Sequence, residues 1–77
     1  MFSELYKLIE QQEEKNECPL YIFGIWMNTN EAPDGSKAID AEHNEAGAAI
    51  IETEEELTEF LEAAGITAEQ IEEALRA

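Results

Sequence analysis

Only one cysteine and one histidine occur in the chain, Cys18 and His43, and they are the first candidates for chemistry. A cysteine nucleophile needs a base within hydrogen-bond reach. Here 25 positions separate the two residues, and neither stands in a recognisable motif. One thiol and one imidazole are also too few ligands for a structural zinc site. We therefore predict no catalytic residue and no metal site, and we interpret Cys18 as a small, partly buried residue in a reducing compartment.

The acidic loop 30–42 is the best candidate for calcium binding, because it contains Asp34 followed by Gly35. If Gly35 takes the glycine position of an EF-hand loop, Ala32 and Ala41 fall on ligand positions, where alanine supplies no side-chain oxygen. Glycine-rich phosphate loops, nucleophile elbows and His-Glu-x-x-His helices do not occur. The sequence predicts no cofactor. A pair of carboxylates that meet in the fold is a catalytic arrangement left open, as is a pairing of Cys18 with His43 that no motif supports.

Charge is the strongest signal in the sequence. The 77 residues carry 19 acids against four bases, for a formal net charge of −15. Nucleic-acid binders neutralise phosphates with lysine and arginine, so we expect no direct binding to DNA, RNA or an anionic membrane. A chain of this length forms one small core and no deep substrate cavity, which argues against an enzyme.

The acids are concentrated where no base accompanies them. Between Ala38 and Leu75 there are twelve acidic residues and no lysine or arginine. On a helix, Glu55, Glu59 and Glu62 share the side opposite the apolar stripe, although like charges at this spacing destabilise a helix by a few tenths of a kcal/mol per pair. The candidate partner-binding residues are Glu52, Glu55, Glu56, Glu59 and Glu62, with Asp40, Glu42, Glu45, Glu69, Glu72 and Glu73 as flanking contributors.

The elements that must position these residues are predicted from periodicity and turn chemistry. We expect one α+β domain, residues 1–77, in the order α-β-β-β-α-α, with a three-stranded antiparallel sheet packed by helices. The apolar run Leu20–Met27 predicts a single strand, favoured as central and covered on both faces; the alternative leaves one face for a partner. The expected ranges are a helix over 4–15 capped by Ser3, strands over 20–27, 38–42 and 48–51, turns over 28–36 and 43–47, and helices over 54–64 and 68–76.

The two closing helices have the clearest boundaries. Thr53 and Thr67 are each followed three residues later by a Glu or Gln, as in the capping box. Gly65 stands where a left-handed residue ends a helix, and Ile66 can fold back on Leu61 as in a Schellman motif.

Three interpretations of the acidic surface remain. In the first, it keeps the domain soluble in a salt-adapted cytoplasm. In the second, it imitates nucleic-acid phosphates and occupies a basic groove on a nuclease, a polymerase or a nucleoprotein defence complex. In the third, the acids are incidental to an adaptor that binds a protein through its apolar strand face or its helix pair.

In size, charge and compactness the whole chain resembles the small acidic inhibitors encoded by phages and mobile elements, among them the anti-CRISPR proteins and other DNA mimics. The resemblance lies in these bulk properties and in no sequence motif. It implies a non-enzymatic inhibitor, acting in the cytoplasm of a host cell, that docks on the Lys/Arg channel of a CRISPR surveillance complex and excludes target DNA. We expect such an inhibitor to act as a monomer.

Overall fold

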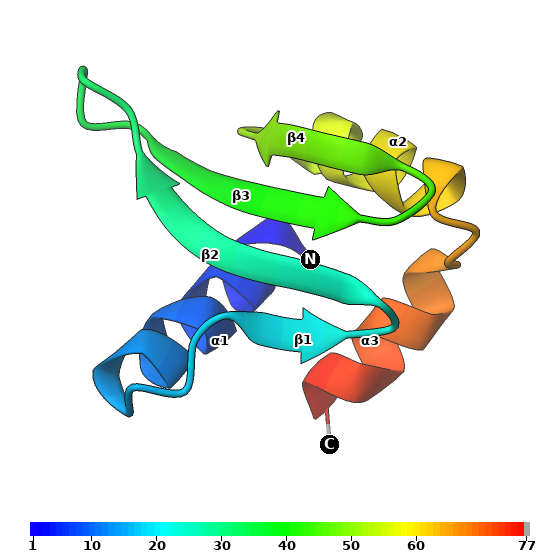
Figure 1. Ribbon diagram of the computed structural model, residues 1–77, viewed down its shortest axis with the longest axis horizontal. Helices are drawn as coiled ribbons and strands as arrows, with labels where there is room; N and C mark the ends of the chain where they lie inside the picture. The colour runs from blue at the N-terminus through cyan, green and yellow to red at the C-terminus, as the bar shows by residue number, and fades with distance from the viewer. Residues whose placement is uncertain (77) are drawn as a thin grey trace.

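The computed structural model describes residues 1–76 and has an α+β fold in which three helices accompany one four-stranded antiparallel sheet (Figure 1). The strands lie in chain order, β1-β2-β3-β4, so each neighbouring pair is joined by a hairpin. The elements are α1 (Phe2–Glu14), β1 (Leu20–Ile22), β2 (Ile25–Glu31), β3 (Lys37–His43), β4 (Gly47–Ile51), α2 (Glu54–Ala63) and α3 (Ala68–Arg76).

The run 20–27 is a hairpin, so the prediction of one strand, and with it the three-stranded sheet, was wrong. Ile22 pairs with Ile25, which leaves Phe23 and Gly24 as a two-residue turn between β1 and β2. Both turn residues have positive φ, 50° and 80°. Two positive φ values are typical of the type I′ turn, whose twist matches that of the paired strands. The usual polar residue before the glycine is replaced by phenylalanine, and the apolar run therefore concealed the turn.

The long connection predicted over 28–36 is much shorter in the structure, because residues 28–31 continue β2 as far as Glu31. The remaining turn is closed by the Ala32 N–H, which donates to the Ser36 carbonyl oxygen at 2.9 Å. Ser36 also donates to the Asp34 carboxylate through its amide, at 2.9 Å, and its hydroxyl, at 2.7 Å. These hydrogen bonds, that of the hydroxyl first, hold the pKa of Asp34 below its ordinary value.

The first helix starts at Phe2, and the predicted N-cap at Ser3 was wrong because Ser3 lies inside the helix. A carboxylate from α2 takes the capping role. The Phe2 N–H donates to Glu54 Oε2 at 2.7 Å, and the amino group of Met1 lies 3.5 Å from Glu54 Oε1. A negative group at this position satisfies a free amide and complements the helix dipole.

Both closing helices begin and end as the sequence predicts, to within one residue. Thr53 Oγ1 accepts a hydrogen bond from the Glu56 N–H at 3.1 Å. Around Thr67 the box is reciprocal, since its hydroxyl accepts from the Gln70 N–H at 3.2 Å and its own N–H donates to Gln70 Oε1 at 2.9 Å. Gly65 has φ 77°, and the amide that follows it donates to the Leu61 carbonyl at 2.9 Å, which confirms the Schellman motif.

All three helices cover the same face of the sheet (Figure 1), and the core lies between them and that face. Alternate residues of the central strands point into this core, including Ile25 and Met27 of β2 and Ile39 and Ala41 of β3. No helix within residues 1–76 covers the other sheet face (Figure 1), so β2 is not covered on both sides as favoured from the sequence. None of the helices within residues 1–76 is both long and apolar enough to span a membrane. The largest fully buried side chains are Leu5, Ile9, Ile25, Met27, Ile39, Ile51, Leu57, Leu61 and Ile71.

Candidate partner-binding surfaces

Every one of the eleven predicted acidic residues is exposed, but the structure distributes them over separate surfaces. The set on and beside α2 lies on the helical side of the molecule, Asp40 and Glu42 lie on the uncovered face of the sheet, and Glu45 lies in the turn between β3 and β4. A third set belongs to α3. The α2 set is Glu52, Glu55, Glu56, Glu59 and Glu62, and the α3 set is Glu69, Glu72 and Glu73.

The α2 set contains a row of three carboxylates, Glu55, Glu59 and Glu62, which we call the α2 acidic row. The buried side chains Leu57 and Leu61 fix the inward side of the helix. At about 100° per residue, the row points directly away from them and from the sheet. It extends over roughly 10 Å of the helix axis at about 1.5 Å per residue. The row is thus a solvent-facing line of negative charge on a packed helix.

Two of the predicted residues have local partners that limit their availability. Glu56 Oε1 accepts hydrogen bonds from the Glu52 N–H at 3.1 Å and the Thr53 hydroxyl at 3.3 Å, so this carboxylate helps to hold the start of α2. Glu72 lies 3.9 Å from Arg76, one turn further along α3. Among residues 1–76, this pair is the one side-chain ion pair. Within the same residues, no basic group forms an ion pair with a member of the α2 acidic row.

Exposed aromatic residues on the uncovered sheet face were not among the predicted site residues. Tyr21 and Trp26 are directly opposed on β1 and β2, with ring centroids 4.8 Å apart. Glu42 is the partner of Trp26 on β3, and Asp40 lies two residues before it on the same face. The sequence signal for this surface was the second apolar face of the run 20–27, which the alternative interpretation left for a partner.

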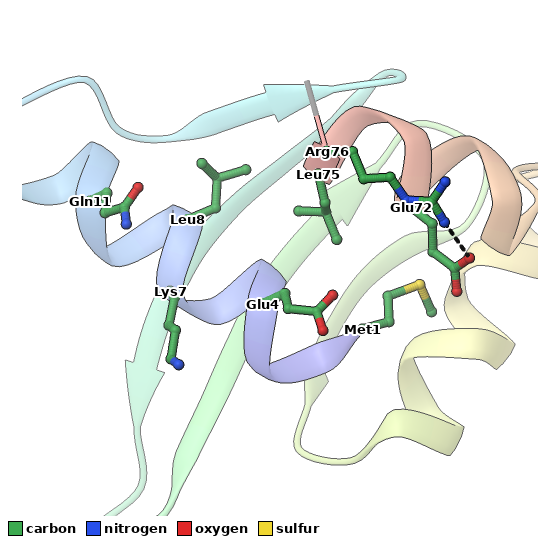
Figure 2. A pocket seen from close by; sticks show the side chains of 8 residues that line it. All are labelled: Met1, Glu4, Lys7, Leu8, Gln11, Glu72, Leu75 and Arg76. Atoms are coloured by element: carbon green, nitrogen blue, oxygen red, sulfur yellow. Dashed lines mark ion pairs between the residues drawn. The ribbon is translucent and has the colours of Figure 1, made fainter.

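A groove of about 660 Å³ lies between α1 and α3 (Figure 2). Lys7 and Arg76, two of the four basic residues of the chain, line it together with Glu4 and Glu72. Figure 2 shows Arg76 reaching toward Glu72 at the end of α3. Basic and acidic side chains are mixed here, so the groove is a poorer imitation of a polyanion than the α2 acidic row. Its full lining is Met1, Glu4, Lys7, Leu8, Gln11, Glu72, Leu75 and Arg76.

Cys18 and His43 are both half-buried and both engaged in local contacts. The Cys18 thiol donates to the Ile9 carbonyl at 3.7 Å, and burial, followed by the nearby Glu13, raises the pKa of this thiol. His43 Nδ1 accepts from the amides of Glu45 and Ala46 at 3.1 and 3.2 Å, which closes the turn before β4. Within residues 1–76, no three His, Cys, Asp or Glu side chains gather as a metal site would require.

No protein-family model, no curated protein and no solved structure matches the chain.

Proposed function

We propose that this protein is a non-enzymatic inhibitor that imitates nucleic acid and occupies a basic DNA- or RNA-binding groove on another protein. The partner class is a nucleoprotein defence complex such as a CRISPR surveillance complex, or a nuclease. The observation that carries the proposal is the α2 acidic row, three exposed carboxylates that no basic group within residues 1–76 pairs with, on a helix held by core packing and a cap.

The charge density of the row supports this proposal. Three charges over about 10 Å of axis correspond to one per roughly 5 Å, against one per about 3.4 Å for a single strand of B-DNA. The exposed carboxylate of Glu52, just before α2, adds negative charge beside the same helix. Rigidity matters equally, because a charge array already in place loses little conformational entropy when it docks.

Solubility alone is the competing explanation, and it makes a different demand on the surface. A solubilising charge works at any exposed position, so the order of the carboxylates has no importance. A mimic depends on the particular row that enters the groove. Position-specific charge reversal therefore distinguishes the two explanations.

The test is competition for a labelled DNA duplex bound to purified CRISPR surveillance complexes and nucleases, followed by fluorescence anisotropy. The wild-type domain is compared with the double variant Glu59→Lys/Glu62→Lys and with Glu14→Lys/Glu17→Lys near the end of α1. Both variants change the net charge equally, and all four residues are exposed without a side-chain partner among the described residues.

We expect the wild type to displace the duplex from its protein. The α2 variant should lose this activity while its circular dichroism spectrum remains that of the folded domain, and the α1 variant should retain the activity. Release should weaken steeply with added salt, because counterions screen the opposed charges. Equal loss in both variants would assign the effect to net charge. Unchanged release by the α2 variant would refute the α2 acidic row as the mimic.

A further inference from the structure

The uncovered side of the sheet combines aromatic, aliphatic and acidic side chains, and we call it the open sheet face. Tyr21 is 59% exposed, Trp26 37% and Ile50 47%. These are large apolar side chains on the side of the sheet that no helix covers. By the strand register, its exposed members are Tyr21, Trp26, Asn28, Asn30, Asp40, Glu42, Ala48 and Ile50, and the buried Ala38 lies opposite Asn30.

The register places the aromatic and acidic groups side by side. Tyr21, Trp26 and Glu42 follow one another across β1, β2 and β3 as directly opposed residues. Directly opposed Cβ atoms on one face are about 4.5–5.5 Å apart, so a group lying over the Trp26 ring is within reach of the Glu42 carboxylate. Asp40 is about 7 Å further along β3 and diagonal to Trp26.

The charge of the open sheet face favours a cationic partner. It carries two carboxylates and no lysine or arginine. Lys37, the basic residue of β3, belongs to the opposite face, where its Nζ lies 5.2 Å from the centroid of the Tyr6 ring. An aromatic face flanked by carboxylates attracts a guanidinium group by cation–π contact and by charge at once.

We propose that the open sheet face binds an extended, arginine-bearing segment of a partner protein. One guanidinium group stacks on Trp26 and pairs with Glu42. Arginines on alternate positions of an extended segment are spaced by about 7 Å, which matches the separation of Glu42 and Asp40, so the second arginine pairs with Asp40. Tyr21 and Ile50 flank this site and contact the aliphatic parts of the segment.

Two other occupants fit the open sheet face less well. A second copy of the chain would bring two net charges of −15 together, with Asp40 and Glu42 facing their own counterparts. A single-stranded nucleic acid stacks on aromatic faces, but its phosphates would then lie near the same carboxylates. A basic protein segment satisfies both the rings and the charges.

This inference does not rest on the proposed mimicry, because the α2 acidic row points away from the sheet. Trp26 is the only tryptophan of the chain, so its fluorescence reports directly on the open sheet face. The probe is the peptide acetyl-Ser-Arg-Ser-Arg-Ser-amide, titrated into the full chain. The matched peptide with citrulline in place of arginine has the same shape without the charge. The protein variants are Glu42→Gln on the face and Glu14→Gln at the end of α1, outside both proposed surfaces.

We expect a saturable change in Trp26 fluorescence with the arginine peptide and none with the citrulline peptide. Glu42→Gln should lower the affinity for the arginine peptide by about 2- to 5-fold, the effect of losing one exposed ion pair, whereas Glu14→Gln should leave that affinity unchanged. Trp26→Leu should lower the affinity for the arginine peptide by a similar factor. Amide chemical shifts of β2 and β3 measure the binding of this variant, which has no tryptophan.

Equal affinity for the citrulline peptide, equal loss of affinity in Glu42→Gln and Glu14→Gln, or the absence of saturable binding would overturn the inference. A dimer in sedimentation, together with Trp26 fluorescence that a soluble quencher no longer reaches, would assign the face to a second copy. Loss of DNA competition in the α2 variants with retained peptide binding would refute neither surface, because the two lie on different sides of the sheet.

Discussion

Removing one charge from the centre of the α2 acidic row should stabilise the domain. Glu59 has like-charged neighbours at Glu55, four residues before it, and Glu62, three residues after it. Each such pair costs a helix about 0.2–0.5 kcal/mol, so Glu59→Gln relieves about 0.4–1 kcal/mol, and Gln has nearly the same helix propensity as Glu. With a urea slope of about 1 kcal/mol/M, the unfolding midpoint should rise by about 0.4–1 M at low ionic strength.

The same substitution at Glu54, five residues before Glu59, should change the stability in the opposite direction. The Glu54 carboxylate holds the Phe2 N–H at the start of α1 and lies in the first turn of α2, where negative charge is favourable. We expect Glu54→Gln to lose about 0.5–1.5 kcal/mol of stability. Urea denaturation followed by circular dichroism measures both variants at low ionic strength and again near 1 M salt, where the screening length is about 3 Å.

High salt should abolish the gain of Glu59→Gln, because the repulsion that the variant relieves is then already screened. If Glu59→Gln destabilises the domain, or if its gain persists in high salt, the α2 acidic row is not under electrostatic strain. The three charges of the row would then be held at no cost to folding.

Two further substitutions and one alkylation reaction test the fold. Gly24→Ala should destabilise the domain by about 1–2 kcal/mol, because an L-residue is strained at φ 80° while a Cβ there would meet His43 no closer than 3.5 Å; thermal unfolding measures the loss. Thr67→Ala removes the hydroxyl that accepts from Gln70 and should cost about 0.5–2 kcal/mol, with unchanged stability disproving the capping role. The raised pKa of Cys18 keeps the protonated thiol dominant at neutral pH, so its alkylation by iodoacetamide should be slow there and should accelerate only above the ordinary thiol pKa; rapid alkylation at pH 7 would contradict its burial.

Helix ends were the part of the fold that the sequence determined best. Thr53, Gly65 and Thr67 act through hydrogen bonds to residues at most five positions away, so their pattern is complete within a short window. The start of α1 was predicted wrongly for the opposite reason. Its cap is the Glu54 carboxylate, which accepts a hydrogen bond from the Phe2 N–H, 52 residues away in the chain. A local sequence pattern cannot predict such a contact.

The division of residues 20–31 depended on backbone conformation that apolar patterning does not encode. Phe23 is an unusual choice for a left-handed turn position, and without an Asn or Asp before Gly24 the run looked continuous. The same error hid the open sheet face, because a single strand covered on both faces would have buried Trp26. The acidic residues were predicted to be exposed and are exposed, but their separation onto opposite sides of the sheet follows from the hairpin topology.

Along β3, the change from buried to exposed side chains between Ile39 and Glu42 separates two kinds of evolutionary constraint within four consecutive residues. Ile39 and Ala41 are almost completely enclosed, so replacing them alters the packing on which folding depends. Asp40 and Glu42, their immediate neighbours in the chain, are exposed on the open sheet face, so replacing them changes what that face binds and leaves the packing intact. A lineage could therefore retune what this domain recognises, one substitution at a time, while its architecture stays untouched.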